Sequence, residues 1–307
     1  MDEQTWWRDG FEEHRPHLRA VAYRMLGSLS EADDAVQDAW LRVERADTGT
    51  VENLGGWLTT VVSRVCLNML RSRGTRGEVP LDVRVPDPLV TPESGADPET
   101  EAVLADSVGL ALLVVLEQLA PAERLAFVLH DTFGVPFADI APMIERTPEA
   151  TRQLASRARR RVRGSTTAPD PDVPRQRAVV DAFFAAARDG DLDRLVAVLH
   201  PDVVLRAEGA HGRPTVITGA HGVASSAPMY SKLAPFVRPV LVNGAAGALV
   251  LVDGRAVSVL AFVVAGGRIV AIDVLSDPAR LVGLDLSGVL PGDRAGGRHG
   301  SGGPGSA

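Results

Sequence analysis

A cluster of arginines between residues 146 and 163 could bind the phosphates and base edges of a nucleic acid. It holds seven arginines and one acid, Glu149. Thr147 is a favourable N-cap and Pro148 suits a first helical position, so the sequence predicts a helix to about Val162. The polar side chains expected on its outer face are those of Arg152, Gln153, Ser156, Arg157, Arg160 and Arg163. This face suits the major groove of duplex DNA, although a solvated basic helix would look similar.

The residues before this basic helix complete a helix-turn-helix pattern. A helix is expected over residues 121–132, and Gly134 should break it. A shorter helix over 137–144 should follow, distorted by Pro142, because proline removes a helical hydrogen bond. The pattern favours a DNA-binding unit.

A second helix combines an aromatic ring, hydrogen-bonding groups and cations. The apolar spacing of residues 54–72 predicts this helix, with Cys66 as a small core residue. The stripe opposite its apolar face consists of Trp57, Thr60, Arg64, Asn68 and Arg71. Single-stranded nucleic acid binds to such a mixture, because bases stack on rings while cations follow phosphates. Taken alone, the stripe fits the simpler interpretation that Trp57 belongs to the core.

A third helix, within residues 31–47, is acidic on one face. Its apolar spacing places Ala32, Ala35, Val36 and Ala39 inward. The outer face carries Asp33, Asp34, Gln37 and Asp38. An acidic face is usually just solvated, and a basic protein partner is the alternative.

Composition limits the class of protein. The chain has 307 residues, 45% hydrophobic and 23% charged, with a net charge of −7 and one cysteine. These values indicate a globular protein without a disulfide framework or a multi-cysteine zinc site. The longest uncharged apolar run is too short to span a membrane, and the first residues do not resemble a signal peptide. We expect a cytoplasmic protein.

Proline and glycine divide the chain into units. Prolines interrupt residues 73–98 and 164–174, and glycine is frequent in residues 287–307 at the C-terminal end. The expected organisation is a helical unit at 1–72, a linker at 73–98, a helix-turn-helix unit at 99–163, a linker at 164–174, a third unit at 175–286 and a disordered tail at 287–307.

The third unit should be a small α+β domain. Helices are expected at 175–189 and 191–199, before a run of short strands. The expected strands are 203–207, 237–242, 248–252, 256–264 and 269–275. Two helices followed by an antiparallel meander predict a curved sheet.

Together, the first two units resemble the extracytoplasmic-function sigma factors of bacterial RNA polymerase. Residues 31–43 (EADDAVQDAWLRV) and 57–71 (WLTTVVSRVCLNMLR) resemble region two of that family. Residues 119–129 (LAPAERLAFVL) and 147–161 (TPEATRQLASRARRR) resemble region four. The resemblance implies mainly α sigma regions and an initiation subunit that directs core RNA polymerase to specific promoters.

The resemblance also assigns roles to the three helices. Asp33, Asp34, Gln37 and Asp38 would bind the β′ clamp helices of the polymerase. The stripe from Trp57 to Arg71 would capture the minus-10 element as a single strand. The outer face from Arg152 to Arg160 would read the minus-35 element as duplex.

The third unit resembles the cone-shaped SnoaL-like (NTF2-like) domain of the SigJ-like subgroup. In that subgroup the domain regulates the sigma regions by docking on them. The corresponding docking residues here are Val85, Pro86, Glu208, Gly209, Arg213, Asp277, Pro278 and Arg280. Ala210 and His211 replace glycines of the family's loop motif, and Arg84 stands where the linker motif has tryptophan.

Parts of the sequence are also compatible with two other functions. The first is a helix-turn-helix repressor or activator that works without core polymerase, although a duplex reader needs neither the acidic face nor the aromatic stripe. The second is a SnoaL-like enzyme or ligand sensor fused to DNA-binding modules. Candidate acid–base groups for it are His200, Asp202, Glu208, His211, His221 and Asp273. We expect no catalysis, no cofactor and no metal, while a small ligand could bind to the C-terminal domain.

Overall fold

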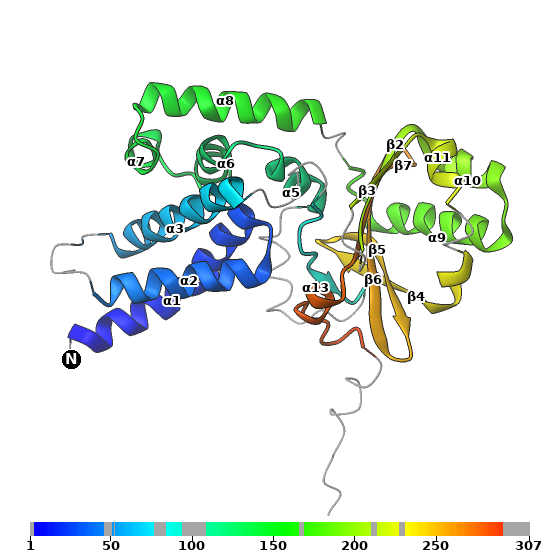
Figure 1. Ribbon diagram of the computed structural model, residues 1–307, viewed down its shortest axis with the longest axis horizontal. Coiled ribbons are helices and arrows are strands. Elements are labelled where there is room, and N and C mark those ends of the chain that lie inside the picture. The colour runs from blue at the N-terminus through cyan, green and yellow to red at the C-terminus, as the bar shows by residue number, and fades with distance from the viewer. Residues whose placement is uncertain are drawn as a thin grey trace, which may run out of the picture.

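The protein is described by a computed structural model, in which helical units lie on one side and a sheet domain on the other (Figure 1). The described residues are 3–45, 51, 53–76, 84–93, 109–165, 169–209, 214–226 and 231–290. Arg213, His211 and residues 291–307 of the expected tail lie outside them.

Three helices form the first unit. They are α1 (Glu3–Leu26), α2 (Leu29–Val43) and α3 (Leu54–Arg76). The Ser28 side chain caps α2 by accepting a hydrogen bond from the backbone N–H of Glu31. The predicted inward face of α2 is buried, and α3 continues four residues past its predicted end at Ser72. Cys66 lies fully inside the core, as expected, and burial raises the pKa of its thiol to about 12.

The second unit is the expected helix-turn-helix. Its elements are α5 (Leu110–Glu117), α6 (Pro121–Phe127), the π-helix η1 (Val128–Thr132), α7 (Phe137–Ile140), the 3₁₀ turn η2 (Ala141–Met143) and α8 (Pro148–Ser165). The predicted helix over 121–132 therefore ends as a π-helix. Pro142 lies in the 3₁₀ turn, which confirms the predicted distortion. Thr147 Oγ1 caps α8 by accepting from the N–H of Ala150 at 3.2 Å.

A buried ion pair joins the two helical units. Arg124 and Glu117 lie 3.0 Å apart with side chains only 1% and 2% exposed. Arg124 also donates to the carbonyl oxygen of Met25, at the end of α1, at 2.9 Å. The pair therefore fixes the second unit against the first.

The C-terminal unit combines helices with a sheet. Its helical elements are α9 (Val173–Asp189), α10 (Leu192–Val198), α11 (Ala220–Ala224), the 3₁₀ turn η3 (Ala234–Phe236) and α13 (Pro278–Val282). Its strands are β2 (Leu199–Gly209), β3 (Thr215–Thr218), β4 (Val237–Val242), β5 (Ala245–Val252), β6 (Arg255–Ala265) and β7 (Arg268–Ser276).

The sheet has one strand from the linker. In the described residues its order is β1-β4-β5-β6-β7-β2-β3, where β1 is Val90–Thr91. Strands β4 to β7 form the predicted antiparallel meander. The predicted strand over 203–207 lies in β2 and outside this meander, because β2 pairs with β7 in parallel. Sequence analysis also missed β1 and β3, which are only two and four residues long.

The two faces of the sheet have different neighbours. Helices α9, α10 and α11 lie on the face away from α1–α3 (Figure 1). The other face packs into a core shared with the linker and the helical units, which includes Val85, Val242 and Leu275. Residues 287–290, expected in the disordered tail, form a turn in which Val289 and Leu290 pack against this shared core.

Asp273 is a buried acid on the linker-facing side of the sheet. Its neighbours Ile272 and Val274 belong to the helix-covered core, so alternation along β7 turns Asp273 to the opposite face. Arg206 on β2 donates to it at 2.9 Å. Burial raises the pKa of Asp273 despite the opposing attraction of Arg206.

The charge pair at the unit boundary gives a stability prediction. Arg124→Met should lower the free energy of unfolding by about 3–5 kcal/mol, because the Glu117 carboxylate stays buried without its partner. The double variant Glu117→Leu/Arg124→Met should lose clearly less, since it leaves no unpaired charge. Urea unfolding followed by circular dichroism measures both. Equal losses from the single and double variants would contradict this account.

The raised pKa of Asp273 predicts a pH dependence. Below pH 3.8, the ordinary pKa of this group, the carboxyl is protonated in both the folded and the unfolded state. The contribution of its raised pKa to the free energy of unfolding is then fully present. As the pH rises through the higher folded-state pKa, that stability is lost, by at most about 1.4 kcal/mol per pH unit for one proton. Asp273→Asn should lack this slope in urea unfolding from pH 4 to 7. The exposed Asp193→Asn serves as control; curves for Asp273→Asn and wild type that run parallel would refute the prediction.

Candidate functional site

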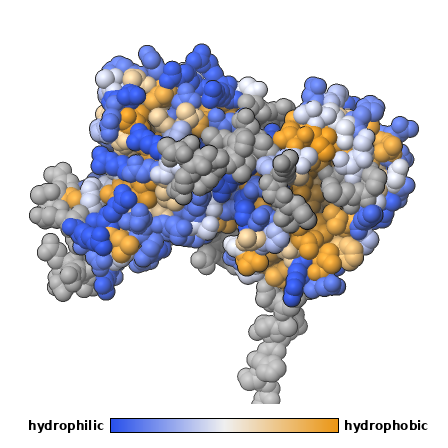
Figure 2. Space-filling model, in the orientation of Figure 1, coloured by the Kyte–Doolittle hydropathy of each residue, from blue (hydrophilic) through white to orange (hydrophobic). Residues whose placement is uncertain are grey.

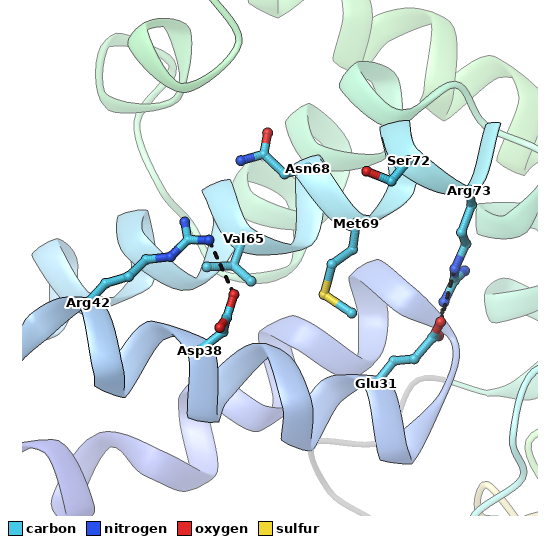
Figure 3. A pocket seen from close by; sticks show the side chains of 8 residues that line it. All are labelled: Glu31, Asp38, Arg42, Val65, Asn68, Met69, Ser72 and Arg73. Carbon is cyan, nitrogen blue, oxygen red and sulfur yellow. Dashed lines mark hydrogen bonds and ion pairs between the residues drawn. The ribbon is translucent and has the colours of Figure 1, made fainter. Parts of the chain in front are cut away.

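A cavity of about 280 Å³ lies between α2 and α3 (Figure 3). Val65 and Met69 of α3 give it an apolar wall, and Asn68 lies on its rim. Ion pairs close its ends: Asp38 with Arg42 at 3.2 Å, and Glu31 with Arg73. The cavity thus brings a residue of the acidic face, Asp38, next to one of the α3 stripe, Asn68.

The acidic face of α2 is exposed, as the periodicity predicted. Asp33, Asp34, Gln37 and Asp38 all lie on the surface. Arg19 donates to Asp33 at 2.6 Å, and Arg42 pairs with Asp38. Exposed ion pairs of this kind are weak, so a basic partner can replace them at little cost.

The α3 stripe is only partly open to solvent. Arg64, Asn68 and Arg71 are exposed. The Thr60 hydroxyl donates to the carbonyl oxygen of Gly56 at 3.0 Å, and Trp57 is half-buried against the helical core. Trp57 therefore belongs partly to the core, as in the simpler interpretation. The side chains of Arg64, Asn68 and Arg71 are exposed and can contact a ligand.

The outer face of α8 carries every polar side chain predicted there. Thr151, Ala155 and Ala158 form its buried side. The exposed residues are Arg152, Gln153, Ser156, Arg157, Arg160 and Arg163. Hydrophilic residues gather over this helix at the top of the molecule (Figure 2). Arg157 is held by Glu123 at 3.1 Å. A cationic surface of this form can follow phosphates and reach base edges in a groove.

Asp87 in the linker contacts both the first and the C-terminal unit. Its carboxylate accepts from the N–H of Leu29, at the start of α2, at 2.8 Å, and from Arg280 Nε at 2.8 Å. Its own N–H donates to the carbonyl oxygen of Gly27, and its carbonyl oxygen accepts from the Tyr23 hydroxyl at 2.5 Å. One residue thus connects α1, α2 and α13.

Arg280 extends this network into the sheet domain. It donates to Glu208 at 2.7 Å and to the carbonyl oxygen of Val85 at 2.7 Å. Glu208 also accepts from the N–H of Val85 at 3.0 Å. Burial disfavours the charged guanidinium, but Asp87 and Glu208 outweigh it and raise the pKa of Arg280. We call Val85, Asp87, Glu208 and Arg280 the linker clamp.

The other predicted docking residues have different places. Pro86 is buried, with its Cβ 3.7 Å from the position a Cβ would take at Gly27. Asp277 caps α13 by accepting from the N–H of Arg280 at 2.9 Å, and Pro278 is the first residue of that helix. Gly209 ends β2 opposite Ser276. Asp277 and Pro278 thus shape the turn that presents Arg280.

Sequence reasoning missed two residues around the clamp: Tyr23 and Asn243. Asn243 Oδ1 accepts from the N–H of Leu89, and its Nδ2 donates to the Tyr23 hydroxyl. A signal existed for Asn243, because Asn-Gly between two strands marks a tight hairpin, and its φ of 49° is the left-handed conformation that turn requires. No local signal pointed to Tyr23, whose side-chain partners lie 64 and 220 residues away in sequence.

The candidate acid–base groups that the structure describes, all except His211, do not converge on one pocket. Glu208 belongs to the linker clamp, and Asp273 faces the same side of the sheet. His200 and Asp202 lie at the exposed start of β2, where Nδ1 of His200 is 3.2 Å from the N–H of Asp202, and His221 is exposed on α11. In the described part of the chain, no three His, Cys, Asp or Glu residues group as metal ligands. No helix there is long and apolar enough to cross a membrane.

Comparisons with known proteins agree with this arrangement. The sigma-70 region 2 family matches residues 11–76, and the sigma-70 region 4 family matches residues 109–162. The ECF RNA polymerase sigma factor SigJ of Mycobacterium tuberculosis is 38% identical over 306 residues, which cover 94% of this chain and 97% of the relative. Probable ECF sigma factor SigI of the same species is 38% identical over 269 residues, 87% of this chain and 92% of the relative.

The similarity extends to a solved structure and to the sheet domain. The crystal structure of M. tuberculosis SigJ matches with a TM-score of 0.71 at 38% identity, covering 90% of this chain and 98% of that chain. Coverage of this extent includes the C-terminal domain, whose helices and sheet make up the predicted α+β fold. The relatives are transcription initiation factors and not enzymes. This chain belongs to the extracytoplasmic-function sigma factors of RNA polymerase.

Proposed function

We propose that the acidic face of α2 binds core RNA polymerase while α3 and α8 bind the promoter. The observation that carries the proposal is the separation of charge: exposed acids on α2, exposed cations on α3 and α8. Opposite fields on separate elements let a protein partner and a polyanion bind at once without competing. Its place of action would be the cytoplasm, where core polymerase works.

The two cationic helices suit two forms of DNA. The α3 stripe offers Arg64, Asn68 and Arg71 beside a half-buried ring, a mixture that fits the unpaired bases of the minus-10 element. Helix α8 offers a continuous polar face from Arg152 to Arg160, which fits the major groove at the minus-35 element. Run-off transcription with purified core polymerase and genomic fragments tests this function and identifies the promoter.

We further propose that the C-terminal domain regulates the sigma regions through the linker clamp. Arg280 and Asp87 lie 193 residues apart in sequence and are both largely buried. Since β1 also extends the sheet, the domain holds the described part of the linker along its length. Holding the linker restricts how far region two and region four can move apart, and its release would change the population of arrangements.

Reversing charge on α2 should weaken polymerase binding. Asp34→Lys/Asp38→Lys should reduce affinity for core polymerase about tenfold, because two attractive rim contacts become repulsive. Pull-down at several salt concentrations and run-off transcription measure the effect. Asp181→Lys/Asp193→Lys, on exposed faces of α9 and α10, is the control and should bind like wild type. Unchanged affinity of the α2 variant would disprove this role for the acidic face.

Removing Arg280 should release the linker. Arg280→Ala leaves the Asp87 and Glu208 carboxylates partly buried without their cation, which costs about 3 kcal/mol. We expect faster tryptic cleavage after Arg84 and an altered transcript yield from the same start site. Arg268→Ala, an exposed arginine of β7, should match wild type in both assays. Faster cleavage with an unchanged yield would argue against regulation through the clamp.

A further inference from the structure

Three side chains of the helix-turn-helix form one stack. Phe137, the first residue of α7, lies on the His130 ring with centroids 3.8 Å apart and planes 26° from parallel. On α8, the Arg152 guanidinium carbon lies 5.5 Å from the centroid of the Phe137 ring. The stack thus connects η1, α7 and α8, and ends at the outer face of α8.

The bottom of the stack is fixed by local structure. His130 Nδ1 lies 3.0 Å from the carbonyl oxygen of Val135; a carbonyl only accepts, so this nitrogen carries the proton and donates. Gly134, with a φ of 67°, makes the tight return of the chain possible. The π-helix η1 presents His130 at this point, and π-helical turns are frequent at functional sites. The Phe137 ring therefore lies on an anchored platform.

An aromatic platform holds an arginine differently from a carboxylate. Glu123 pairs with Arg157 and Arg161, and Asp131 pairs with Arg159, so those guanidiniums donate N–H groups within the protein. No carboxylate among the described residues forms an ion pair with Arg152. Contact with a ring uses the face of the guanidinium and leaves its in-plane N–H donors available. Among these four arginines, Arg152 is the one whose orienting contact leaves its N–H donors available to a ligand.

We propose that Phe137 is a positioning residue that presents Arg152 to a guanine of the minus-35 element. Two parallel N–H donors match the O6 and N7 acceptors of guanine in the major groove, and this is the commonest specific arginine–base contact. The stack holds Arg152 in place before DNA binds, so the side chain loses fewer conformations on binding. An exposed cation–π contact of this kind changes an equilibrium constant about two- to fivefold. The proposal rests on the proposed function, in which α8 reads duplex DNA.

The test uses the full chain with core polymerase and the promoter recovered by run-off transcription. Every minus-35 position is replaced by each other base, and relative transcript yields give the base preference at each position. Arg152→Ala should reduce a guanine preference at one position about tenfold or more. Phe137→Leu should reduce the preference at that same position about two- to fivefold, and Phe137→Tyr should restore it. Adding Phe137→Leu to Arg152→Ala should have no further effect there.

Two controls separate positioning from folding. Phe133→Leu removes a similarly half-buried ring that contacts His17 and Arg24 instead of Arg152, and should leave every preference unchanged. Arg160→Ala should weaken all promoter variants alike, as loss of a phosphate contact does.

The outcomes distinguish the two proposals. If wild type produces no promoter-dependent transcript, the proposed function fails. If it does, but Arg152→Ala changes no single-position preference, the function stands and the positioning role is overturned. The role is also overturned if Phe137→Leu lowers yield at every position alike or leaves the preference intact.

Discussion

The contact between Asp87 and Arg280 determines how the linker, the first helical unit and the sheet domain of this sigma factor are arranged. A carboxylate this deeply buried needs compensation for its lost hydration. Asp87 receives it from Arg280 and from the N–H of Leu29 at the start of α2, where the helix dipole also favours an anion. The linker, the first helical unit and the sheet domain therefore meet at one charged group, and none of the three can move there alone.

The same region supports the proposed action of the sheet domain on the sigma regions. Its linker-facing side contributes Val242 and Leu275 to a core that also includes helices of both sigma regions. Arg124, buried between α5, α6 and the end of α1, joins region four to region two by polar contacts. Displacing the linker would therefore disturb contacts beside both DNA-binding units. Under the proposed regulation, a small surface of the C-terminal domain would thus influence both sigma regions.

The surfaces proposed to bind polymerase and promoter do not depend on one kind of contact. The α2 acids pair weakly with neighbouring arginines at the surface, so they can exchange partners. Several α8 arginines are held by carboxylates, whereas Arg152 lies on an aromatic ring. Such differences in how equal charges are held allow one helix to combine general attraction for phosphates with a directional contact to a base.

Local periodicity and capping signals determined helices α2, α3 and α8, their exposed faces and the β4–β7 meander. Asp34, Asn68 and Arg152 lie outside because a spacing of three and four residues puts apolar neighbours inside, whatever the helix packs against. The parallel pairing of β2 with β7, the strand β1 and the contacts of Tyr23, Asp87 and Asn243 were decided by the tertiary structure. Each joins segments tens to hundreds of residues apart, and a burial pattern does not say which partner compensates a buried charge. The stacking of His130 on Phe137 likewise depends on the π-helix η1, whose sequence resembles that of an ordinary α-helix.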